Sequence, residues 1–102
     1  MSIKKAEKHL EPWSIEESKQ FLNMYLDGVK MRDVSIVCEQ IASTLKRTYD
    51  AIKLRKQEVL SILTDAESGL KREKWTPHMI EAIKQVKEER NISTQRMIMW
   101  FE

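Results

Sequence analysis

This chain of 102 residues has few residues that interrupt helices, two glycines and two prolines. It has one cysteine, the residue that forms disulfides. Glycine and proline are the residues least compatible with a helix interior, so their scarcity favours an all-helical protein. A single cysteine, Cys38, cannot form an intrachain disulfide, which is typical of intracellular proteins. We therefore expect an intracellular protein, cytoplasmic and nucleoid-associated in a bacterium or phage, or nuclear in a eukaryote.

Long apolar runs and catalytic groupings are also missing. No stretch approaches the roughly 20 apolar residues that cross a bilayer, and the N-terminus has no apolar segment of a secretory signal. His9 and His78 lie far apart with no thiol near either, which excludes metal-ligand spacing. The paired acids at 16–17 and 88–89 are consecutive, so they point in different directions on a helix. We expect no membrane span, metal, cofactor or enzymatic activity.

The charges that are present nearly cancel, since 18 Lys and Arg face 16 Asp and Glu. At 41% apolar and 33% charged residues, the composition indicates a folded domain rather than a disordered chain. Any attraction to nucleic acid must therefore come from a local cluster of positive charges. Such a cluster runs from Leu45 to Gln57, "LKRTYDAIKLRKQ", in which five cations accompany one acid, Asp50.

Helix boundaries can be located from capping residues. Ser14 with Glu17 forms a capping-box pattern at the start of a first helix, and Gly28 is a natural stop. A second helix, with Ile36 and Val37 inward, is expected from about residues 33–35. Thr48 can cap a third, on which Leu45, Tyr49, Ile52, Val59 and Leu63 mark the buried side.

The remaining segments have different compositions. Residues 1–11 are interpreted as a flexible arm, and residues 64–74 as a linker. Thr76 and Pro77 predict another helix start, and Asn91 or Ser93 caps a last short helix. Residues 75–102 are therefore expected to form a helical extension. Its apolar tail either folds back into a core or forms a surface for dimerisation or a protein partner; the residues are Met97, Met99, Trp100 and Phe101.

Residues 12–63 predict three helices with a short turn before a basic third one, which is a helix-turn-helix pattern. "WSIEE", a glycine after one helix, and "IASTLKRTYDAIKLR" together resemble a Myb/SANT-like DNA-binding domain over about residues 12–60. The short turn before Arg47 is closer to compact domains of bacteria and phages. The first of three regularly spaced family tryptophans is present, as Trp13, and the other two are replaced.

The resemblance implies that the third helix lies in the major groove of duplex DNA. The positions that would face bases are Asp50, Lys53, Leu54 and Gln57. The positions that would contact phosphates are Lys46, Arg47, Thr48, Arg55 and Lys56. Asp50 has two readings, as an acceptor for a cytosine amino group or as an acid that stabilises the helix N-terminus. With about five phosphates neutralised, log K should fall with log salt at a slope near −4 to −5.

We therefore expect a small DNA-binding protein, a transcriptional regulator of bacterial or phage type. The alternative is a SANT-like adaptor or inhibitor that binds a host or partner protein. The basic third helix favours DNA over the protein-binding alternative.

Overall fold

The computed structural model describes residues 12–68 and 77–102, and every regular element in these two ranges is an α-helix. The helices are α1 (Ile15–Gly28), α2 (Val34–Leu45), α3 (Tyr49–Ser68), α4 (Pro77–Arg90) and α5 (Thr94–Phe101). The all-helical prediction is confirmed. The expected arm, residues 69–74 of the expected linker, and Trp75 and Thr76 lie outside the described residues.

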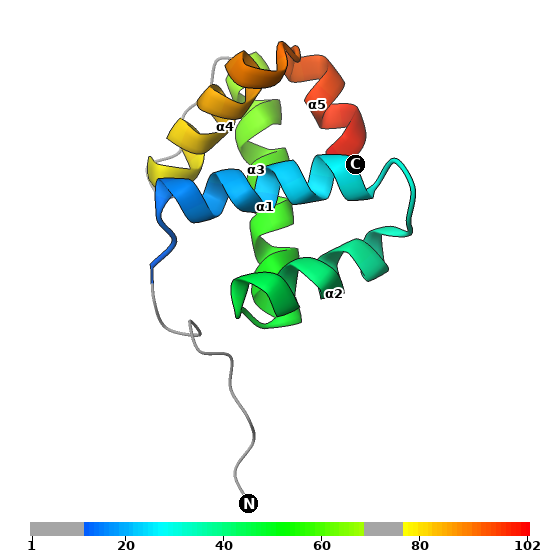
Figure 1. Cartoon of the computed structure of the whole chain (residues 1–102). Helices are drawn as coiled ribbons and strands as arrows, with labels where there is room; N and C mark the ends of the chain where they lie inside the picture. Colours follow the sequence, from blue (N-terminus) through cyan, green and yellow to red (C-terminus); the bar gives the residue numbers. More distant parts are fainter. Residues whose placement is uncertain (1–11, 69–76) are drawn as a thin grey trace, which may run out of the picture.

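The longest helix, α3, crosses behind α1 and joins the two ends of the molecule (Figure 1). Helix α2 packs against α1 and the first half of α3, whereas α4 and α5 lie at the other end of α3. Helix α4 also packs along α1.

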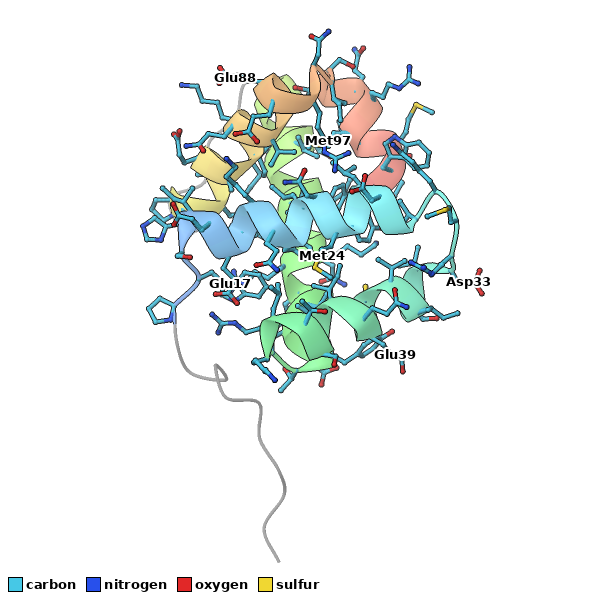
Figure 2. All side chains as sticks on the ribbon, in the orientation of Figure 1. Glu17, Met24, Asp33, Glu39, Glu88 and Met97 are labelled. Carbon is cyan, nitrogen blue, oxygen red and sulfur yellow. The ribbon has the colours of Figure 1, made fainter. Side chains whose placement is uncertain are left out.

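One apolar core runs through all five helices. Phe21 and Tyr25 of α1 are fully buried at its centre, and the Tyr25 ring stacks on Phe101 of α5 with 4.2 Å between ring centroids. Figure 2 shows Met97 on the inner side of α5, where its side chain is also fully buried. The C-terminal tail thus folds back into the core.

This burial corrects half of the partner surface expected for the tail. Met97 and Phe101 are inaccessible because they fill the space between α5, α1 and α3. Met99 is 73% exposed, and Trp100 is partly buried against the core. Helices α4 and α5 are therefore integral to the fold that α1–α3 begin.

Hydroxyl caps define three helix starts as the sequence predicts. The Ser14 Oγ accepts a hydrogen bond from the Glu17 backbone N–H at 3.0 Å. The Thr48 Oγ1 accepts one from Ala51 at 3.1 Å. Of the two residues considered for α5, Ser93 is the N-cap, accepting from the Arg96 N–H at 3.1 Å. Each cap satisfies a backbone donor that has no partner inside its helix.

Asn91 instead ends α4 in the left-handed conformation, with φ 55°. Asparagine tolerates this conformation better than most residues.

Gly28 is the last residue of α1, and a glycine is needed there for a steric reason. The residue after it, Val29, keeps a right-handed conformation with φ −70°, so no left-handed glycine cap is formed. A Cβ atom at Gly28 would lie 2.8 Å from Cγ1 of Val37 in α2. The glycine therefore permits the close approach of α2 to the end of α1.

Helix α3 is longer than expected. It continues to Ser68, so residues 64–68 of the expected linker are helical. Ile62 and Leu63 are buried in the core and anchor this part of the helix. The residues after them, 64–68, are small, polar or charged, and their composition alone could not distinguish the end of a helix from a linker.

Candidate nucleic-acid interface

The turn between α2 and α3 is three residues long, Lys46–Thr48, and has a defined geometry. Lys46 adopts the left-handed conformation, with φ 61°. The Arg47 N–H donates to the Ala42 carbonyl at 3.0 Å, which closes the end of α2. Thr48 then caps α3 directly. This turn sets the direction in which α3 leaves α2.

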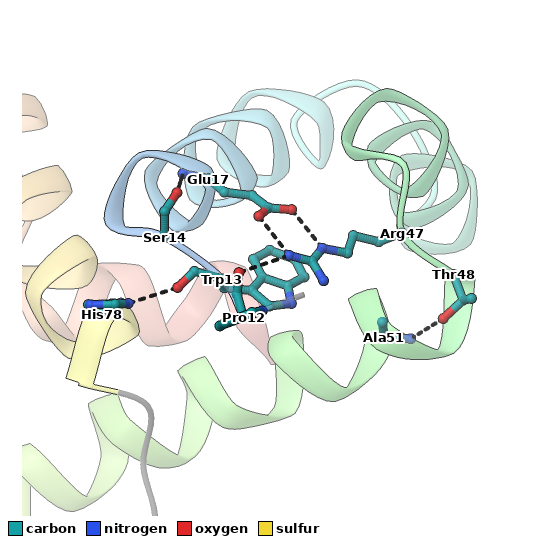
Figure 3. A network of polar contacts seen from close by, with 8 residues as sticks. All are labelled: Pro12, Trp13, Ser14, Glu17, Arg47, Thr48, Ala51 and His78. Atoms are coloured by element: carbon teal, nitrogen blue, oxygen red, sulfur yellow. Dashed lines mark hydrogen bonds and ion pairs between the residues drawn. The ribbon is translucent and has the colours of Figure 1, made fainter. Parts of the chain in front are cut away.

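Arg47 is buried beneath the turn rather than exposed on it. Its Nε and Nη2 donate to the two carboxylate oxygens of Glu17 at 2.7 and 2.8 Å (Figure 3). Nη2 also donates to the Pro12 carbonyl at 3.3 Å. Arg47 is 5% exposed and Glu17 7%. The expectation that Arg47 contacts phosphate is therefore corrected, because its charge is already neutralised inside the protein.

The Trp13 ring lies beside the same ion pair. The guanidinium carbon of Arg47 is 4.8 Å from the ring centroid, and that of Arg55 is 5.6 Å away. A ring nitrogen of His78, Nδ1, makes a 2.8 Å hydrogen bond with the Trp13 carbonyl oxygen (Figure 3). Trp13 thus links the start of α1 to α3 and α4, and it is a core residue, as expected.

Two other expected phosphate ligands are engaged within the protein. Arg55 pairs with Glu58 at 2.6 Å and is partly buried. Lys56 is also partly buried, and its Nζ donates to the Phe101 carbonyl at the end of α5 at 3.2 Å. Lys46 stays exposed, and Thr48 is partly buried as the cap of α3. The cationic surface is therefore smaller than the sequence suggests.

The first half of α3 carries a continuous exposed surface, which we call the α3 strip. It consists of Tyr49, Asp50, Lys53, Leu54 and Gln57. Each of these residues lies three or four positions from another member of the set, so their side chains form one face of the helix. At 1.5 Å per residue the strip is about 12 Å long. All four residues expected to face bases lie on it.

Tyr49 differs from its expected place on the buried side of α3. It is 36% exposed, and the Lys53 ammonium lies 5.4 Å from its ring centroid. Three other residues expected on this side of α3, Ile52, Val59 and Leu63, are buried there. Leu45, also expected on the third helix, is buried as the last residue of α2. Tyr49 therefore forms one edge of the α3 strip, and Leu54, which is 62% exposed, forms the other.

Asp50 is exposed in the first turn of α3. There its carboxylate lies near the positive end of the helix dipole. This position is compatible with both readings given to Asp50 above.

A second surface was not expected from the sequence. Met31 is 74% exposed, and Val34 and Ile36 at the start of α2 are 41% and 43% exposed. Ile36 was expected to point inward with Val37, and only Val37 is buried. A shallow hollow of about 480 Å³ lies here, lined by Val29, Met31, Arg32, Asp33 and Ile36. We call the three exposed apolar residues, Met31, Val34 and Ile36, the α2 patch.

Cys38 is buried, as expected for a small apolar residue. Burial raises the pKa of its thiol, although Lys56 and Lys53 act in the opposite direction. In residues 12–68 and 77–102, no three His, Cys, Asp or Glu side chains are grouped to hold a metal ion. In the same ranges, no helix combines the length and apolar character needed to cross a membrane.

No protein-family model, curated protein or solved structure matches this chain. The resemblance to Myb/SANT-like domains therefore stays an expectation carried by the residues quoted above. A helical fold alone is compatible with many activities, so the surface chemistry of the chain is what can indicate a function.

Proposed function

We propose that the protein binds duplex DNA, with the α3 strip in the major groove, and acts as a transcriptional regulator of bacterial or phage type. The observation that carries the proposal is the composition of the α3 strip. An exposed helix face presents an ammonium, an amide and a carboxylate side by side, with Lys46 on the preceding turn. These are groups that read base edges.

The dimensions of a helix are compatible with this reading. An α-helix with its side chains is about 10–12 Å across, and the major groove of B-DNA, about 12 Å wide, admits one helix. Lys53 is suited to guanine O6 and N7, and Gln57 to adenine N6 and N7. Lys46 would contact the adjacent phosphate backbone.

In this proposal α1, α2 and α3 act as a helix-turn-helix unit of the Myb/SANT-like kind. Arg47 and Glu17 take part without contacting DNA. Their two hydrogen bonds join the α2–α3 turn to the first turn of α1. The angle of α3 is thereby fixed by a buried contact, and base-reading side chains need such a fixed support.

The burial of Arg47 changes the expected salt dependence. Arg55 and Lys56 are engaged within the protein as well, so Lys46 and Lys53 are the two exposed cations of the basic run that remain for DNA. The slope of log K against log salt should then be near −2, shallower than the −4 to −5 expected from the sequence.

The proposal is tested by selecting bound duplexes from a random pool at two salt concentrations. Affinity for the selected duplex is then measured for the wild-type protein and for Lys53→Ala. The matched control is Lys84→Ala, which removes one exposed charge from α4, outside the α3 strip. Lys53→Ala should weaken binding by about 1–3 kcal/mol, and Lys84→Ala should change it little.

Two results would count against DNA binding. One is the absence of any bound duplex at low salt. The other is an equal loss of duplex affinity in Lys53→Ala and Lys84→Ala. That result would indicate a general effect of net charge instead of contact through the α3 strip.

The α2 patch favours a second candidate, a protein-interaction module. Exposed apolar residues gathered round a hollow are typical of protein interaction sites. A library screen for binding partners would separate the two functions. If Ile36→Ser or Met31→Ser abolishes binding of a partner and Lys53→Ala does not, the protein-binding function is supported. If Lys53→Ala abolishes binding and the two serine variants do not, that partner does not bind through the α2 patch.

A further inference from the structure

Leu54 is an apolar residue at one edge of the α3 strip, beside its polar residues. Its side chain is 62% exposed, and the core positions of α3 are already filled by Ile52, Val59, Ile62 and Leu63. Asp50 lies one turn before Leu54 and Gln57 nearly one turn after it. A single exposed leucine is ordinary on a protein surface. This one differs because it sits among groups with base-reading chemistry.

The chemistry of the major groove gives each residue of the strip a different complement. Lys53, Gln57 and Asp50 can each hydrogen-bond to a base edge, to guanine, adenine and cytosine respectively. Leu54 can do none of this. The apolar group that a base pair displays in the major groove is the C5-methyl of thymine. Cytosine methylated at C5 displays the same group.

The spacing along α3 allows these contacts on one duplex. Leu54 and Gln57 are three residues apart, which is about 4.5 Å along the helix axis. Successive base pairs are about 3.4 Å apart. An adenine bound by Gln57 and a methyl group touched by Leu54 can therefore come from neighbouring base pairs.

We propose that Leu54 reads the C5-methyl group of a pyrimidine, so that the sites bound by this protein contain a thymine whose methyl is required for full affinity. This inference rests on the proposed DNA-binding function and specifies its target. Burying one methyl-sized group contributes about 0.8 kcal/mol, which is about a four-fold change in Kd. The effect is small and measurable in a matched comparison.

The experiment uses the full chain and the duplex selected from the random pool. Each thymine of that duplex is replaced in turn by uracil, which removes the methyl and keeps the hydrogen-bonding groups. Wild-type protein should lose about four-fold in affinity at one thymine. Leu54→Ala should bind the thymine duplex about as weakly as wild type binds the uracil duplex, and should not distinguish the two.

Two controls accompany this comparison. Met99→Ala removes an exposed apolar side chain on α5, away from the strip, and should keep the uracil effect. Thermal unfolding of Leu54→Ala checks the fold, which alanine at an exposed helical position should preserve. A uracil effect of the same size in wild type and Leu54→Ala would overturn the inference, because another residue or the duplex shape would then sense the methyl.

Failure of this inference is distinguishable from failure of the proposed function. If no duplex is bound, DNA binding itself is wrong. If a duplex is bound through Lys53 and no uracil substitution changes affinity, DNA binding stands and methyl reading by Leu54 is refuted.

Discussion

Removing the Glu17 carboxylate should destabilise this protein more than any change to its surface charges. Arg47 is 5% exposed, and Glu17→Ala would remove the carboxylate that neutralises its guanidinium. Breaking a buried ion pair from one side costs about 3–5 kcal/mol, because a charge remains in a poorly solvated place. That is a large part of the roughly 5–15 kcal/mol that stabilises an ordinary domain.

Two other contacts of Arg47 moderate this loss. The Pro12 carbonyl accepts from Arg47 Nη2 at 3.3 Å, and the Trp13 ring lies 4.8 Å from the guanidinium carbon. Neither group carries a negative charge. We therefore expect the lower part of the range for Glu17→Gln, which keeps one acceptor oxygen, and the upper part for Glu17→Ala.

Urea unfolding followed by circular dichroism measures the effect. With a slope of about 1–3 kcal/mol/M, a loss of 4 kcal/mol lowers the midpoint by about 1.3–4 M. The double variant Glu17→Leu with Arg47→Met tests the cause, because it removes both charges and keeps apolar volume. It should be more stable than Glu17→Ala, since replacing a whole buried pair is often neutral.

The matched control is the pair between Lys19 and Glu89, which joins α1 to α4 at 2.6 Å with side chains 25% and 55% exposed. Lys19→Ala should cost about 0–1 kcal/mol. If Glu17→Ala is no more destabilising than Lys19→Ala, the ion pair does not fix the α2–α3 turn, and the account of how α3 is positioned is wrong.

Three further predictions address the core and the turn. Phe101→Ala should cost about 3–5 kcal/mol in urea unfolding, whereas exposed Met99→Ala should stay within about 0.5 kcal/mol; equal losses would mean that α5 is not part of the core. Lys46→Gly should leave stability unchanged or raise it by up to about 1 kcal/mol, because glycine adopts φ 61° without strain. The same change should weaken duplex binding and make the salt slope shallower by about 0.9; loss of stability would refute the strain argument. Burial raises the pKa of Tyr25 to about 12, so stability should be complete below pH about 10 and fall as pH rises towards 12. Within the described residues its hydroxyl has no hydrogen-bond partner, so Tyr25→Phe should remove that alkaline loss without destabilising the protein at neutral pH; an unchanged pH profile would contradict this.

Local signals in the sequence predict helix starts well, since each depends on residues a few positions apart. Ser14, Thr48 and Ser93 cap helices as expected, because a hydroxyl and the backbone donor it satisfies belong to the same turn. Apolar spacing likewise identifies most of the buried side of α3. Tyr49 was misplaced because it lies at the edge of that side, where periodicity does not discriminate.

Contacts between distant parts of the chain could not be read in this way. Arg47 and Glu17 are 30 positions apart, so no spacing rule indicates that a cation in a basic run is neutralised by a specific acid in another helix. The same limit applies to the tail. Its apolar residues predict burial against some surface, and only the packing of α5 on α3 and α1 identifies that surface as this protein's own core.

Adjacent residues at the α2–α3 turn therefore differ in what they can contribute to function. Lys46 is exposed at the left-handed end of α2, while Arg47 points inward to Glu17. If the protein binds DNA, the charge of Lys46 should act on affinity and the charge of Arg47 on stability. If a variant of Arg47 loses duplex binding only to the extent that it is unfolded, the charge of Arg47 acts on stability, as expected. A folded Arg47 variant with a shallower salt slope would show that the guanidinium reaches phosphate after all.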